Sequence, residues 1–158
     1  MNNVSFAIGI NFPPEWSNDV KILIDTDIRP SENPELVLQA VKTLFPTLIY
    51  NISDNIIMGK SDNPKALHHL CNRIFELQIL DAARRNILEA LLEYSSEDFP
   101  MIAEFFLSKQ VALIDKVSFI DPEEATLGSI AVKIISSELK KFLDLFFPKF
   151  EWFTESRL

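Results

Sequence analysis

The chain has 158 residues, 47% of them apolar and 24% charged, which is the size and make-up of one domain with a substantial core. Acidic side chains outnumber basic ones by 23 to 15, so the net charge of −8 opposes long-range attraction to phosphate, and contact with nucleic acid needs a local basic patch. The lone Cys71 excludes an intramolecular disulfide, and no signal peptide or membrane-spanning apolar run is present, so we expect a cytoplasmic protein.

The N-terminal part of the chain contains two strand candidates. Residues 4–10 are the first, and residues 20–28 are the second, with alternating carboxylates that suit a strand with one face near solvent. Pro13 and Pro14 interrupt the series of backbone donors between them. We therefore expect residues 12–19 to form a connection.

A capped helix follows. Asn33 can cap the free amides of a helix, and Pro34 has the backbone angle of a first helical position and needs no donor there. Apolar residues at helical spacing predict a helix that runs to about Phe45 and stops at Pro46. Residues 47–58 are expected to form one or two β segments.

A second helix start, Asn63-Pro64, opens a long helical region. Neither glycine nor proline appears again before Pro100, so residues 64–94 are predicted to be mostly helical. One helix of that length is unusual in a domain of this size. The apolar stripe changes phase near Gln78, which predicts a bend or break at that point.

From Met101 onward the apolar period becomes that of strands, with turns at Asp121-Pro122 and near Gly128. The predicted strands cover residues 102–107, 111–120 and 130–135. Ser136 or Ser137 is expected to cap a final helix that runs through Phe147.

The predicted element order is β-α-β-α-α-β-β-β-α. This order indicates an α+β domain in which helices pack on one face of a mainly antiparallel sheet. We expect a single domain over residues 1–158, with a variable leader at 1–19, a core at 20–148 and a tail at 149–158.

Three stretches, residues 28–46, 73–85 and 106–132, resemble a family of small archaeal proteins that are labelled as RNA-binding. Members of that family are related in fold to the fifth protein of the large ribosomal subunit. The resemblance extends over residues 20–148. It implies a ribosomal-protein-like α+β fold and an RNA ligand.

Basic and amide side chains are the candidate RNA contacts, because a guanidinium forks onto two phosphate oxygens and helical spacing can align several of them. Arginines and glutamine on the 73–85 stretch are joined by a lysine and a glutamine between two predicted strands, where a hairpin tip or bulge would expose both side chains. The candidates are Arg73, Gln78, Arg84, Arg85, Lys109 and Gln110.

Each of these residues also has a structural explanation. Asp81 and Glu89 lie at helical spacing from Arg84 and Arg85, so ion pairs along one helix could satisfy both arginines. Lys109 could instead protect a strand edge from pairing with another chain.

No catalytic, cofactor or metal site is expected. His68 and His69 face different sides of a helix and Cys71 falls on its apolar stripe, so they do not make a four-ligand zinc site. Asp25 and Asp27 point the same way on a strand, and a solvated strand end explains them better than a shared Mg²⁺ or acid-base site.

Our leading prediction is therefore a non-enzymatic RNA-binding module or a subunit of an RNA-handling assembly. The alternative is a protein-interaction or homodimeric scaffold without nucleic-acid binding. In that alternative, the partner meets an acidic face or the aromatic tail at 150–153, where Trp152 is a residue type enriched in interface cores.

Overall fold

A five-stranded sheet runs through the computed structural model, which describes residues 20–94, 101–121, 123 and 128–147. Its strands lie in the order β2-β3-β1-β5-β4, and every neighbouring pair is antiparallel. Their bounds are β1 Lys21–Asp27, β2 Ile49–Ser53, β3 Ile56–Ser61, β4 Met101–Ser108 and β5 Ser129–Ser136. The predicted α+β class with an antiparallel sheet is confirmed.

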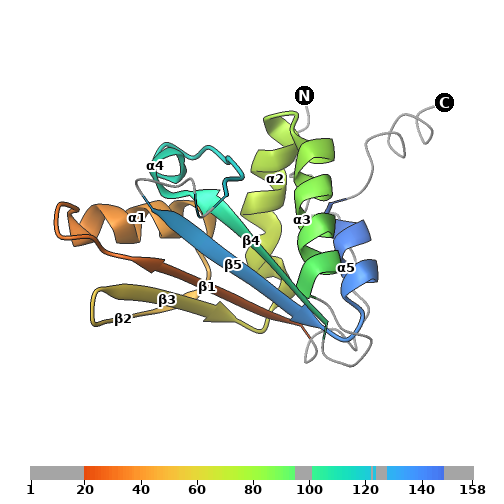
Figure 1. The fold of residues 1–158 in the computed structure, drawn as a ribbon, viewed down its shortest axis with the longest axis horizontal. Coiled ribbons are helices and arrows are strands. Elements are labelled where there is room, and N and C mark those ends of the chain that lie inside the picture. The colour runs from red at the N-terminus through yellow and green to blue at the C-terminus, as the bar shows by residue number, and fades with distance from the viewer. Residues whose placement is uncertain (1–19, 95–100, 122, 124–127, 148–158) are drawn as a thin grey trace.

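The helices lie on one side of this sheet, with the β2–β3 hairpin at the margin farthest from α3 (Figure 1). Their bounds are α1 Pro34–Leu44, α2 His68–Glu76, α3 Leu80–Tyr94, α4 Lys109–Ala112 and α5 Leu139–Phe146, with a 3₁₀ turn, η2, at Pro64–Leu67. The buried side chains of sheet and helices form one apolar cluster. Removing the apolar surface of these side chains from water is the main stabilising contribution to the fold.

Local capping and turn chemistry explain where these elements begin and end. The Asn33 side chain accepts the Glu35 amide at 2.9 Å, and the Asn63 side chain accepts the Lys65 amide at 3.0 Å. Both predicted helix starts are thus confirmed. The predicted break is confirmed as well, because Gln78 has a φ of 59° between the end of α2 and the start of α3.

The β region predicted over residues 47–58 is a hairpin. Asp54 and Asn55 join β2 to β3 with φ values of 51° and 62°. Two left-handed residues in a row make the tight turn whose twist matches that of antiparallel strands, and asparagine and aspartate tolerate this conformation.

Alternation along β1 separates the two faces of the sheet. Ile22, Ile24 and Thr26 are buried beneath the helices, whereas Lys21, Leu23, Asp25 and Asp27 are exposed on the opposite side. We call this exposed side of the sheet the open face. It includes the residues of the other strands that pair, directly or through a neighbouring strand, with these four residues of β1. An antiparallel sheet commonly leaves one face uncovered in this way.

One predicted strand is wrong. Residues 111–120 do not form a strand: Lys109–Ala112 is the short helix α4, and the remainder is a loop that pairs with β4 only at an isolated bridge between Leu107 and Phe119. Alternating apolar residues suggested a strand, but Ala112 and Val117 are buried from a helix and a loop.

Three expectations lie outside the described residues: the strand over 4–10, the connection over 12–19 and the tail at 149–158. None of the helices that the structure describes is both long enough and apolar enough to cross a membrane.

Candidate functional site

Arg84 connects α3 to the end of α5. Its Nη2 donates to Asp144 Oδ1 and its Nη1 donates to the carbonyl of Phe147, each at 2.8 Å. The residue is only 9% exposed. Arg84 thus forms an ion pair that joins two helices.

Arg73 on α2 is engaged with the loop after α4. Its Nε donates to the Asp115 carbonyl at 2.8 Å and lies 3.3 Å from Asp115 Oδ2. His69 Nε2 approaches the other oxygen of the same carboxylate at 2.7 Å. Asp115 has a φ of 61°, so these contacts hold a residue in the left-handed region that few side chains adopt.

Lys109 is buried, which corrects the expectation that a hairpin tip or bulge would expose it. Its side chain is 4% exposed, and Nζ donates to the Asp27 carbonyl at 2.8 Å and to Glu32 Oε1 at 3.0 Å. Asp27 Oδ1 lies 3.3 Å away. A buried ammonium needs such partners, because desolvation alone strongly disfavours its charge. Lys109 therefore holds α4 against the end of β1 and the start of α1.

The pKa of Asp27 reflects this contact. Partial burial alone would raise the pKa, but the hydrogen bond and charge of Lys109, together with the charge of Arg29, lower it overall. Asp25 and Asp27 both point to the open face, as predicted.

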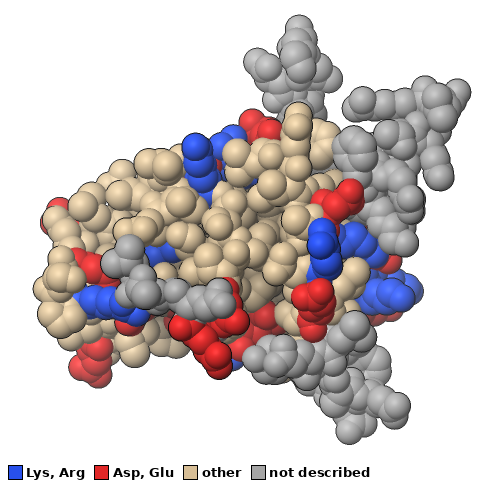
Figure 2. All heavy atoms as spheres, turned by 45° about the horizontal axis from the view of Figure 1, so that its top comes forward, with Lys and Arg blue, Asp and Glu red and all other residues tan. Residues whose placement is uncertain are grey.

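The other three candidate residues are exposed but lie on separate elements. Gln78 is in the turn between α2 and α3, Arg85 is on α3, and Gln110 is on α4. Figure 2 shows basic side chains interspersed with acidic ones over the face that it presents. Of the six sequence candidates, these three are thus exposed, whereas Arg84 and Lys109 are buried.

The open face presents a different set of side chains, arranged in rows across the strands. One row contains Ile49, Lys60, Leu23, Lys133 and Glu104, from β2 to β4 in spatial order. Lys133 Nζ lies 3.7 Å from Glu104 Oε2, which makes a cross-strand ion pair.

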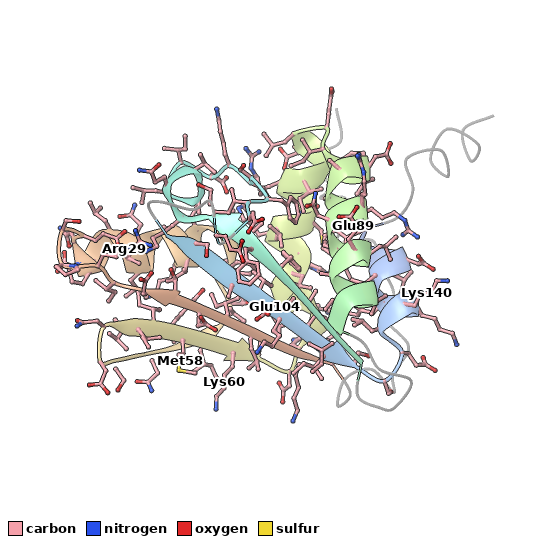
Figure 3. The ribbon with its side chains drawn as sticks, in the orientation of Figure 1. Arg29, Met58, Lys60, Glu89, Glu104 and Lys140 are labelled. Carbon is pink, nitrogen blue, oxygen red and sulfur yellow. The ribbon has the colours of Figure 1, made fainter. Side chains whose placement is uncertain are left out.

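The adjacent row contains Asn51, Met58, Asp25, Ala131 and Phe106 in the same order. A hollow of about 320 Å³ lies between the two rows, with a mainly apolar lining. Figure 3 labels Met58 on β3, which belongs to this row, and Glu104 on β4, which belongs to the first row.

Exposed apolar side chains concentrate on this face. Seven large apolar residues are exposed in the described part of the chain, and four of them stand on the adjacent strands β2, β3 and β1 of the open face. They are Leu23 at 38%, Ile56 at 43%, Met58 at 56% and Ile49 at 71% exposure. Single exposed apolar residues are ordinary, but a contiguous group commonly marks an interaction site.

Charge on the open face is balanced, although the chain as a whole is acidic. The strand positions of this face carry three lysines and three carboxylates: Lys21, Lys60, Lys133, Asp25, Asp27 and Glu104. Phe106 is the single aromatic residue at the open-face positions of the described strands.

Sequence reasoning missed this surface. The alternation of residues 20–28 indicated one solvated face, but Ile49, Ile56 and Met58 have the composition of core residues. Only the strand register, with Ile57 and Gly59 on the covered side of β3, places these three on the open side.

Burial changes the acid-base properties of Cys71 and His68 on α2. Burial raises the pKa of the Cys71 thiol well above its ordinary value, which opposes formation of the nucleophilic thiolate. Burial, with a smaller contribution from the charge of Lys65, lowers the pKa of His68. Within the described ranges, no three His, Cys, Asp or Glu residues are grouped so that they could hold a metal ion.

Sequence comparison identifies relatives that match most of the chain. A UPF0201 protein of Sulfurisphaera tokodaii is 32% identical over 136 residues, and the match covers 82% of this chain and 88% of the relative. The chain belongs to the UPF0201 family. A further UPF0201 protein, from Methanothermobacter thermautotrophicus, is 29% identical over 128 residues, with 81% of this chain and 91% of the relative covered. No family model matches the chain.

Solved structures of UPF0201 proteins have the same fold. One crystal structure, described as an uncharacterized UPF0201 protein, superimposes with a TM-score of 0.68 at 26% identity and covers 82% of this chain and 94% of that one. The UPF0201 protein of Methanococcus jannaschii gives 0.65 at 27% identity, with 82% and 93% covered. The predicted resemblance to an uncharacterised archaeal family is thus confirmed. RNA binding and the ribosomal-protein-like fold stay predictions.

Proposed function

We propose that this protein is a protein-interaction module and that the open face of its sheet is the docking surface. The observation that carries the proposal is the group of exposed apolar side chains on β2, β3 and β1, led by Ile49 and Met58. Burying such a group against a partner is favourable, because apolar area leaves water without any hydrogen bond being lost.

The locations of the basic candidates support this proposal over RNA. Arg84 and Lys109 are buried in ion pairs within the protein, and Arg73 is engaged with Asp115. A phosphate ligand would have to compete with these contacts, and the acidic net charge repels it at long range.

RNA is the second candidate because three lysines, Lys21, Lys60 and Lys133, stand on the open face. RNA-binding sheets use their uncovered face, where basic residues contact phosphates and aromatic residues stack on bases. Two observations favour the protein partner: acidic residues stand among these lysines, and Phe106 is the one aromatic residue that the described strands place on this face.

Position-specific photocrosslinking tests the proposal. A photoreactive amino acid replaces Met58 on the open face or, as a matched control, Ile114, which is 62% exposed in the loop after α4. We expect protease-sensitive adducts from position 58 and none from position 114. Adducts that nuclease removes would favour RNA, and equal labelling from both positions would contradict docking on this face.

A further inference from the structure

We infer that the protein docked on the open face is a second copy of this chain, related by a two-fold axis that runs across the strands. This inference rests on the proposed function and names its partner. Its basis is the distribution of charge along the strands of the open face.

Apart from Glu104, which pairs with Lys133 in its own row, the basic and acidic side chains of this face occupy different levels along the strands. Lys60 stands opposite Leu23, and one row further along the strands Asp25 stands opposite Met58. Lys21 lies one row from Leu23 in the direction opposite to Asp25. The face is therefore basic toward the start of β1 and acidic toward its end.

A two-fold axis across the strands reverses their direction in the second copy. The basic rows of one copy then lie over the acidic rows of the other, so Lys60 faces the neighbourhood of Asp25 in its partner, and the same contact recurs by symmetry. Packed sheets lie about 10 Å apart, a gap that a lysine side chain spans to reach a carboxylate. An axis parallel to the strands would instead place β3 of one copy over β5 of the other. Lys60 would then face Lys133, and the two positive charges would repel each other.

The apolar residues suit this arrangement as well. Leu23 on the central strand β1 and Met58 on β3 belong to the two rows that flank the axis, so Leu23 of one copy lies beside Met58 of the other, and the contact recurs by symmetry. Reciprocal contacts of this kind are characteristic of isologous interfaces. The local balance of charge removes from the interface the repulsion that two chains of net charge −8 would otherwise experience.

The first test is the mass of the purified full-length chain by light scattering over a range of concentrations. We expect a species of twice the 18.1 kDa of one chain that dissociates on dilution. Met58→Lys should raise the dissociation constant at least about tenfold, because the reversed rows place the new ammonium against Lys60 of the second copy. Ile114→Lys, the matched exposed control, should leave it unchanged.

A charge exchange tests the orientation of the two copies. Lys60→Glu and Asp25→Lys should each weaken self-association, because each places like charges opposite one another. When the two variants are mixed, opposite charges face each other at both symmetric contacts, so a heterodimer should form. Failure of the mixture to associate while wild type dimerises would overturn the two-fold arrangement.

The two proposals fail in different ways. A chain that stays monomeric at every concentration, but whose position-58 crosslinker captures another protein, overturns self-association and leaves the protein-interaction function in place. A monomer that gives no adduct from position 58 contradicts both proposals.

Discussion

Arg84 on α3 and Asp144 on α5 form an ion pair of 2.8 Å between residues 60 positions apart in the chain. The arginine side chain is 10% exposed and the aspartate 37%, so the contact lies at the edge of the core. A residue that sequence spacing suggested as an RNA contact thus connects two helices.

We expect Arg84→Met to lower the free energy of unfolding by about 2 kcal/mol, because hydrogen bonds to a charged group are lost and Asp144 is left without this partner. Urea unfolding followed by circular dichroism measures the loss. Arg85→Met, the exposed neighbour on the same helix, is the control and should change stability by less than about 0.5 kcal/mol. Equal effects of the two substitutions would show that the ion pair contributes nothing.

Lys109→Met should also destabilise the fold by about 2 kcal/mol, since it leaves the Glu32 carboxylate without the ammonium that it accepts from. Gln110→Met, at the next and exposed position, is the control for a change on α4. If Lys109 instead served a ligand, Lys109→Met would abolish binding and leave the unfolding midpoint in urea unchanged.

The same lysine affects acid stability. The pKa of Asp27 is lower in the folded chain than its ordinary value of 3.8, so the unfolded chain takes up this proton first as the pH falls. The resulting stability is present above about pH 4 and is lost as the pH drops through the folded pKa. Lys109→Met should flatten that part of a stability-against-pH profile. A profile parallel to that of the wild type would contradict the coupling.

His68 should make stability depend on pH in a higher range. Burial lowers its pKa below 6.5 in the folded chain, so the unfolded state binds its proton first as the pH falls. Stability should therefore decrease as the pH falls from about 7 toward the folded pKa. Unfolding midpoints of wild type and His68→Leu across this range provide the measurement, and the variant should lack this decrease.

Asp115 allows backbone strain to be separated from side-chain contacts. Both Asp115→Ala and Asp115→Gly remove the carboxylate that His69 and Arg73 approach, but only glycine adopts the φ of 61° without cost. We expect the alanine variant to be less stable than the glycine variant by about 1 kcal/mol in urea unfolding. Equal stability would indicate that the loop relaxes to another conformation.

Elements whose signals are local were predictable from sequence. Asn33-Pro34 and Asn63-Pro64 carry their own capping atoms, and the phase change near Gln78 marks the break between two helices. Contacts between distant residues were not predictable, because no short-range pattern shows that Arg84 meets Asp144 or that Arg73 meets Asp115. The site was missed for the same reason, since only strand pairing reveals which apolar residues remain uncovered.

The central position of β1 determines when the sheet can be completed. Its Ile24 pairs with Gly59 on one side, 35 positions away, and with Val132 on the other, 108 positions away. During synthesis, β1, α1 and the β2–β3 hairpin can associate early, whereas the second edge of β1 waits for nearly the entire chain. Long-range pairing of this kind slows folding. The half-formed sheet then offers an unpaired central strand to other nascent chains, and a truncation before β5 would make that exposure permanent.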